Sequence, residues 1–248
     1  MIPKYFHFFD TSRNRKIPVI VYFSNNQSNK VVIYNPGYGG GPENMKKAEA
    51  GERKWPMEQA EYLAKFFVAK GYNFISIQHD LPGDTGGLET LDPNAVQAIV
   101  RKPLWIRAEQ NLLFVIDELK KKFPALNFDK FIIGGHSNGG DIAKFFANNH
   151  EEMIDFVISL DGRRCPIKSN ANLKILMFEA SDTSTDDGVI PKEGTQENPL
   201  RQNLEWIVIK PKTAVHESYC DNHVDAKDDN IEVQKQVCKT IEWIVDNF

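Results

Sequence analysis

The segment Gly135-His136-Ser137-Asn138-Gly139 has the residue types of a nucleophilic site. It matches the pattern GxSxG and lies between the apolar run FIIG and the helical pattern DIAKFFANN. A sharp strand-to-helix turn holds such a serine in a strained conformation with its hydroxyl exposed, and the glycines allow neighbouring backbones to approach closely. The pattern and its context therefore predict that Ser137 is a nucleophile.

A serine hydroxyl attacks only when a base removes its proton, and histidine is the side chain best suited to that task. His150 ends the helical pattern that follows Ser137 and is expected to point away from the strand ends. His216 follows the apolar run WIVIK by a short loop, whereas His223 lies deeper in a segment that turns helical. The chain order serine, acid, histidine favours His216 as the base.

Two aspartates could orient that base, because each directly follows an apolar run. Asp161 comes after FVISL, and Asp182 comes after LKILMFEAS. Either could instead be an ordinary turn or cap residue. Strand order by itself favours Asp182, because an acid after the penultimate strand is the commoner layout.

The anionic intermediate of acyl transfer needs N–H donors. One is expected from Asn138, which follows the candidate nucleophile. The other is expected from the glycine-rich segment VVIYNPGYGGG, most plausibly the backbone N–H of Tyr38, although the same glycines are compatible with a flexible loop. These two residues are the predicted oxyanion hole.

A metal site is the competing interpretation of the C-terminal histidines. His216, Cys220 and His223 could be ligands, since one helical turn separates His216 from Cys220. Tetrahedral zinc needs a recognisable set of three or four ligands, and no fourth ligand stands nearby. We expect no metal and no cofactor.

The elements that would position these residues alternate along the chain. Apolar runs at Tyr5–Phe9 and Ile17–Phe23 predict an N-terminal hairpin. Further strands are predicted at 31–35, 72–77, 130–135, 155–160, 173–178 and 206–210, and helices at 56–70, 103–122, 138–149 and 230–247. This alternation predicts a single α/β domain over 1–248, with a mostly parallel sheet, helices on both faces and ligands at the carboxyl ends of the strands.

Composition excludes some classes of partner. The 30 Lys and Arg residues against 34 Asp and Glu residues leave no basic excess for a nucleic acid. No apolar run is long enough to span a bilayer, so no integral membrane association is expected. The N-terminus does not resemble a signal peptide, and the 3 cysteines do not form a disulfide framework, so a cytoplasmic location is expected.

The chain resembles the dienelactone-hydrolase-like branch of the α/β-hydrolases, and within it the platelet-activating-factor acetylhydrolase group. The resemblance covers most of the chain and lies in the segments DTSRNRKIPVIVYF, VVIYNPGYGGG, AKGYNFISIQHD, GGHSNGGDIA, VISLDGRRCP and IVIKPKTAVHESYCD. In that group the acid has an apolar-LD context, which ISLDG matches, and the histidine has a VHxxxxD context, which VHESYCD matches. The resemblance implies the triad Ser137, Asp161 and His216, with Asp182 left as the alternative acid.

The chain also departs from that group. Asn35 and Pro36 replace its usual Ser-His pair, and Asn138 replaces a phenylalanine. Only residues 161–172 separate two predicted strands, which leaves no room for a large lid domain there, so loops are expected to roof the pocket.

The expected activity is hydrolysis of small-molecule carboxylic esters with small or medium acyl groups, through an acyl-enzyme. A serine peptidase or acyltransferase would use the same chemistry and is the alternative. An inactive, hydrolase-like binding protein is the third hypothesis. The sequence does not indicate the oligomeric state or the physiological substrate.

Overall fold

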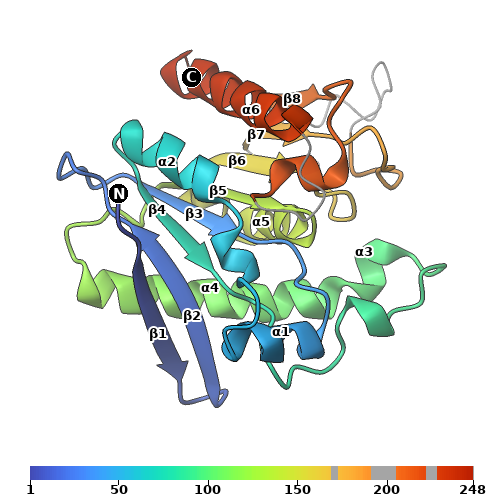
Figure 1. The fold of residues 1–248 in the computed structure, drawn as a ribbon, viewed down its shortest axis with the longest axis horizontal. Coiled ribbons are helices and arrows are strands. Elements are labelled where there is room, and N and C mark those ends of the chain that lie inside the picture. The colour runs from blue at the N-terminus through green and yellow to red at the C-terminus, as the bar shows by residue number, and fades with distance from the viewer. Residues whose placement is uncertain (169–172, 191–204, 222–227, 248) are drawn as a thin grey trace.

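The computed structural model describes residues 1–168, 173–190, 205–221 and 228–247. Its centre is an eight-stranded sheet with the order β1-β2-β4-β3-β5-β6-β7-β8 (Figure 1). β1 and β2 form an antiparallel hairpin that joins β4, and all strands from β4 to β8 in that order run parallel. The strands are β1 Lys4–Asp10, β2 Arg15–Tyr22, β3 Val31–Asn35, β4 Asn73–Ile77, β5 Phe131–His136, β6 Ile154–Leu160, β7 Lys174–Phe178 and β8 Glu205–Ile209.

Helices cover both faces of this sheet. α4 and α5 pack on one face, and α2 and α6 pack on the other. The shorter α1 and α3 lie in the connections that follow β3 and β4. The helices are α1 Pro42–Glu49, α2 Glu61–Ala69, α3 Gln97–Val100, α4 Lys102–Lys122, α5 Asn138–Asn149 and α6 Asp228–Asn247.

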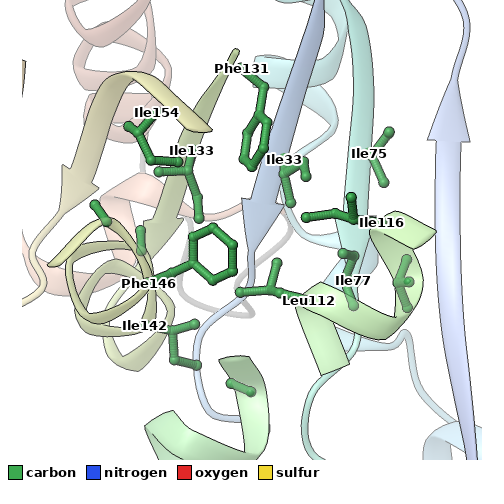
Figure 2. Close-up of a cluster of buried hydrophobic side chains, with 14 of the residues drawn as sticks. Ile33, Ile75, Ile77, Leu112, Ile116, Phe131, Ile133, Ile142, Phe146 and Ile154 are labelled. Carbon is green, nitrogen blue, oxygen red and sulfur yellow. The ribbon is translucent and has the colours of Figure 1, made fainter. Parts of the chain in front are cut away.

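Alternation along the buried strands explains the two-sided core. In β3, Ile33 points toward α4 and α5, whereas Val32 and Tyr34 point toward α2 and α6. On the face covered by α4 and α5, aliphatic and aromatic side chains of the strands pack against those of the helices, as Figure 2 shows. The labelled residues are Ile33, Ile75, Ile77, Leu112, Ile116, Phe131, Ile133, Ile142, Phe146 and Ile154. Because both faces are buried, these strands are continuously apolar, as the sequence predicted.

Two features of the connections differ from the prediction. The helix expected over 56–70 is broken: a 3₁₀ turn covers Pro56–Glu58, and α2 begins only at Glu61. Glu58 accepts a hydrogen bond from the backbone N–H of Trp55, which caps the start of the short turn, and the break before α2 comes at Ala60, whose φ of −135° and ψ of 34° are not helical. The structure also contains α1 and α3, which the sequence did not predict, because α1 has few apolar residues and the 4 residues of α3 are too short for a periodic pattern.

The parallel register places the strand ends together. Asn35 pairs with Gly135, and His136 pairs with Leu160, which in turn pairs with Phe178. The carboxyl ends of β3, β5, β6 and β7 therefore lie along one edge of the sheet, where the residues after each strand can meet.

Candidate active site

Ser137 occupies the turn between β5 and α5. Its φ of 54° and ψ of −124° lie outside the regions that a side chain normally allows. The conformation is held from both sides, because the N–H of Ser137 donates to Leu160 O at 2.9 Å and its carbonyl accepts from the N–H of Gly140 at 3.0 Å. The predicted strained turn is thus present.

Two glycines allow the backbone of this turn to approach the end of β3 closely. A Cβ on Gly139 would lie 2.0 Å from Asn35 O and 2.4 Å from Pro36 O. A Cβ on Gly135 would lie 2.3 Å from the backbone of Gly139. No side chain fits at either position, which is the physical reason for the two outer glycines of the motif.

His216 begins the 3₁₀ turn η5, His216–Tyr219, which follows β8. Its Nε2 lies 3.0 Å from Ser137 Oγ. Its Nδ1 makes a short contact with Asp161 Oδ2. The structure therefore brings three of the predicted site residues into one line, from hydroxyl through imidazole to carboxylate.

Asp161 directly follows β6, and its carboxylate is fully buried. Oδ1 accepts a hydrogen bond from the N–H of Ala180 at 2.9 Å, and the Thr183 hydroxyl donates to both carboxylate oxygens. The Arg163 guanidinium lies 3.3 Å from Oδ2. Burial by itself raises the pKa of this carboxyl, but the hydrogen bonds and the positive charges lower it below its ordinary value overall. Asp161 is therefore held as an anion next to the imidazole.

Asp182 contacts the same histidine in another way. Its Oδ1 accepts a hydrogen bond from the backbone N–H of His216 at 2.8 Å. Both candidate aspartates therefore contact His216: Asp161 contacts the imidazole, and Asp182 contacts the main chain.

The residues predicted to supply the oxyanion donors, Asn138 and Tyr38, belong to segments next to Ser137. Asn138 is the first residue of α5, so its N–H has no carbonyl partner within the helix. Its side chain turns inward, and Oδ1 accepts from Trp105 Nε1 at 3.1 Å. The glycine-rich loop runs beside the serine, because a Cβ on Gly37 would lie 3.5 Å from Ser137 Cβ. The phenol of the next residue, Tyr38, donates to Glu89.

Solved structures share this architecture. MGS-M1, an alpha/beta hydrolase enzyme from a Medee basin deep-sea metagenome library, matches with a TM-score of 0.60 and 16% identity, over 97% of this chain and 96% of that one. A dienelactone hydrolase from Anabaena variabilis matches with a TM-score of 0.53 and 15% identity, over 96% of each chain. An acylaminoacyl peptidase from Pyrococcus horikoshii matches with a TM-score of 0.59 and 11% identity, over 97% of this chain and 41% of that one.

This chain has the α/β-hydrolase fold. The predicted fold class is confirmed, including the antiparallel hairpin and the mostly parallel sheet. No family model matches the chain, and no curated protein matches it by sequence. At such low identities the likeness establishes the fold, and the activity depends on the site residues.

Sequence reasoning missed a buried ion pair beside this candidate site. Lys144 is fully buried in α5, and its Nζ donates to Gly162 O at 2.8 Å and lies 3.4 Å from Asp141 Oδ1. Asp141 in turn accepts the backbone N–H groups of Arg164 and Cys165. The pair thereby anchors the loop that begins at Asp161. Its three-residue spacing on the helix was the available signal.

Two large aromatic residues close to the candidate site have structural contacts. Trp105 and Tyr219 are buried, and the Tyr219 hydroxyl donates to Glu179 O at 2.9 Å. Trp55 lines two surface pockets of about 520 and 580 Å³ beside the N-terminal hairpin. His150 contacts Glu109 at the far end of α5.

Within the described ranges, no three His, Cys, Asp or Glu side chains gather in a way that could hold a metal ion. His223 lies outside the described residues. Among the described helices, none has the length and apolar character needed to cross a bilayer.

Proposed function

We propose that this chain is a serine hydrolase that cleaves small-molecule carboxylic esters. The observation that carries the proposal is the contact chain from Ser137 Oγ through His216 to Asp161. Each member has the environment that its role requires: a strained, partly exposed hydroxyl, an imidazole with both nitrogens engaged, and a buried carboxylate held as an anion.

In the proposed reaction, Ser137 Oγ attacks the ester carbonyl carbon while His216 Nε2 takes the hydroxyl proton. Asp161 accepts the hydrogen bond from Nδ1–H and stabilises the imidazolium. The backbone N–H groups of Tyr38 and Asn138 bind the oxyanion. As the ester C–O bond breaks, His216 returns the proton to the leaving alcohol. Water, activated by the same imidazole, then hydrolyses the acyl-enzyme and releases the acid.

The finer parts of the proposal concern substrate and location. Residues 161–172 are too few for a lid domain, which favours small or medium acyl groups. Cys165, Cys220 and Cys238 are all free thiols, which favours a reducing, cytoplasmic location. The acylaminoacyl peptidase shares the fold, so a peptidase or acyltransferase is the second candidate.

A fluorophosphonate probe tests the proposal directly. The folded protein should be labelled once, and peptide mapping should place the adduct on Ser137. Ser137→Ala should abolish labelling, whereas Ser12→Ala, at the tip of the N-terminal hairpin, should not change it. Product analysis with esters of increasing acyl length, blocked peptides and acceptor alcohols then separates the esterase, peptidase and acyltransferase. Absence of labelling in the folded protein would contradict a serine-hydrolase function.

A further inference from the structure

His136, the last residue of β5, makes two hydrogen bonds that converge on one turn. Its imidazole is buried, with 3% exposure. Nε2 lies 2.9 Å from the backbone carbonyl oxygen of His216, and Nδ1 lies 3.0 Å from Cys220 Sγ. His216 begins the turn η5, and Cys220 directly follows it. One side chain next to Ser137 therefore joins both ends of the turn that carries the proposed base.

The chemistry of these partners allows only one tautomer of His136. A carbonyl oxygen only accepts hydrogen bonds, so Nε2 must carry the proton. Nδ1 of a neutral ring is then an acceptor, and the Cys220 thiol must donate to it. Burial lowers the pKa of His136 to about 3, and burial raises the pKa of the Cys220 thiol above its ordinary value. Both groups thus stay uncharged at neutral pH.

This arrangement fixes the main chain of His216 on both sides. Asp182 binds its backbone N–H, and His136 binds its carbonyl. The rings of His136 and His216 also pack together, with their centroids 4.6 Å apart. The contact from His216 Nε2 to Ser137 Oγ depends on this placement, and displacements of about 1 Å in such a contact slow a reaction by about 10²-fold.

We propose that His136 is a positioning residue for the hydrolase reaction, and that the Cys220 thiol acts through it by tying the second end of the turn η5 to its Nδ1. The inference rests on the proposed function of Ser137 and His216. The contact with the His216 carbonyl already fixes the Nε2–H tautomer, so the thiol adds a second attachment of the turn to the same ring. Without the thiol donor, Nδ1 is left as an unpaired buried acceptor and the Cys220 end of the turn is no longer tied to β5, so the placement of His216 is less well defined.

Cysteine variants test the donor. Cys220→Ala should lower kcat about 10-fold while KM changes less than about 2-fold, because an alignment made for the transition state is lost. Cys220→Ser keeps an O–H donor and should restore kcat to within about 3-fold of wild type. Cys238→Ala, at the half-buried cysteine of α6, is the matched control and should leave kcat unchanged. Equal losses in Cys220→Ser and Cys220→Ala would overturn the proposal.

A double-mutant cycle tests whether the thiol acts through the imidazole. His136→Gln keeps an N–H donor in the side chain, whereas His136→Phe keeps the ring volume without it, so the phenylalanine variant should lose more kcat. Adding Cys220→Ala to His136→Phe should cause no further loss, since phenylalanine has no nitrogen to accept the thiol hydrogen bond. Additive losses in the cycle, or full kcat in His136→Phe, would overturn the inference.

Nitrogen NMR of the histidine rings measures the protonation and hydrogen bonding of each ring nitrogen in the protein without substrate. The His136 signals, assigned from His136→Gln, should show the Nε2–H tautomer in the wild type and in Cys220→Ala, and the Nδ1 signal should shift in Cys220→Ala because its hydrogen bond is lost. An Nδ1–H tautomer in the wild type would overturn the inference. A protein that shows the expected tautomer but fails to react with fluorophosphonate would contradict the proposed function alone, so the two failures are distinguishable.

Discussion

The carboxylate of Asp182 binds the backbone N–H of His216, whereas Asp161 binds its imidazole Nδ1. The two acids therefore differ in what they can control. Only Asp161 can select the imidazole tautomer and stabilise the imidazolium that forms during turnover. Asp182 can only hold the main chain of the turn in place.

Exchange of each acid for its amide should separate these roles. Asp161→Asn should reduce kcat by about 10³- to 10⁴-fold with little loss of stability, because the wrong tautomer becomes favoured. Asp182→Asn should reduce kcat about 10-fold or less, because an amide oxygen still accepts the N–H. Steady-state kinetics with melting temperatures would measure both. A nearly normal Asp161→Asn protein beside an inactive Asp182→Asn protein would reverse the assignment.

A methyl group at Gly139 should disrupt the serine turn. Gly139→Ala places a Cβ 2.0 Å from Asn35 O, and backbone atoms on both sides prevent relief. We expect a loss of more than about 3 kcal/mol in the free energy of unfolding, together with loss of probe labelling at Ser137. Gly134→Ala is the matched control on β5, because its Cβ would lie 3.2 Å from Ile158 O and needs only a small adjustment. Urea titrations that rank the two variants equally would contradict this account.

Lys144 should contribute more to stability than a surface lysine does. Lys144→Met keeps the length of the side chain but leaves the buried Asp141 carboxylate without its cation and Gly162 O without its donor. Loss of one partner of a buried pair costs about 3–5 kcal/mol. Lys65→Met removes an exposed pair with Glu61 and should change the unfolding free energy by less than about 1 kcal/mol. Chemical denaturation of both variants gives the comparison.

Stability should fall as the pH drops below 6.5, because two histidines are buried in neutral form. Burial lowers the pKa of His79 and of His136 to about 3, so below pH 6.5 the unfolded chain binds two protons that the folded chain does not bind. Each proton lowers the unfolding free energy by about 1.4 kcal/mol per pH unit in this window. Asp80 opposes the change between pH 6 and 3.8, because burial raises its pKa to about 6 and its folded form binds a proton first.

The histidine contribution is isolated by a single substitution. His79→Gln removes one of the two groups that bind a proton only in the unfolded chain. The slope of the unfolding free energy against pH between 7 and 5 should therefore decrease by up to about 1.4 kcal/mol per pH unit. Urea midpoints at several pH values would measure the slope. An unchanged slope would show that His79 is protonated equally in both states.

Chelation should leave activity intact, since the proposed chemistry uses protein groups alone. EDTA treatment followed by an ester assay is the measurement. Loss of activity that zinc restores would instead support a metal site at His216, Cys220 and the undescribed His223.

The sequence by itself determined the fold class and the place of the candidate nucleophile. Both signals are local: strands buried on two faces are continuously apolar, and the GxSxG turn carries its strand and helix beside it. The same locality explains why β3 and α5 have the predicted bounds, Val31–Asn35 and Asn138–Asn149.

Only the tertiary structure decided how the two acids divide their contacts with His216. Asp161 and Asp182 both follow strands; strand order by itself favours Asp182, and only the resemblance of ISLDG to a family context implied Asp161. The contact with the imidazole depends on where β6, β7 and the turn after β8 end in space. The roles of His136, Cys220 and Lys144 were hidden for the same reason. Each makes its decisive hydrogen bonds to residues that are distant in sequence, and such bonds form only after the sheet brings the strand ends together.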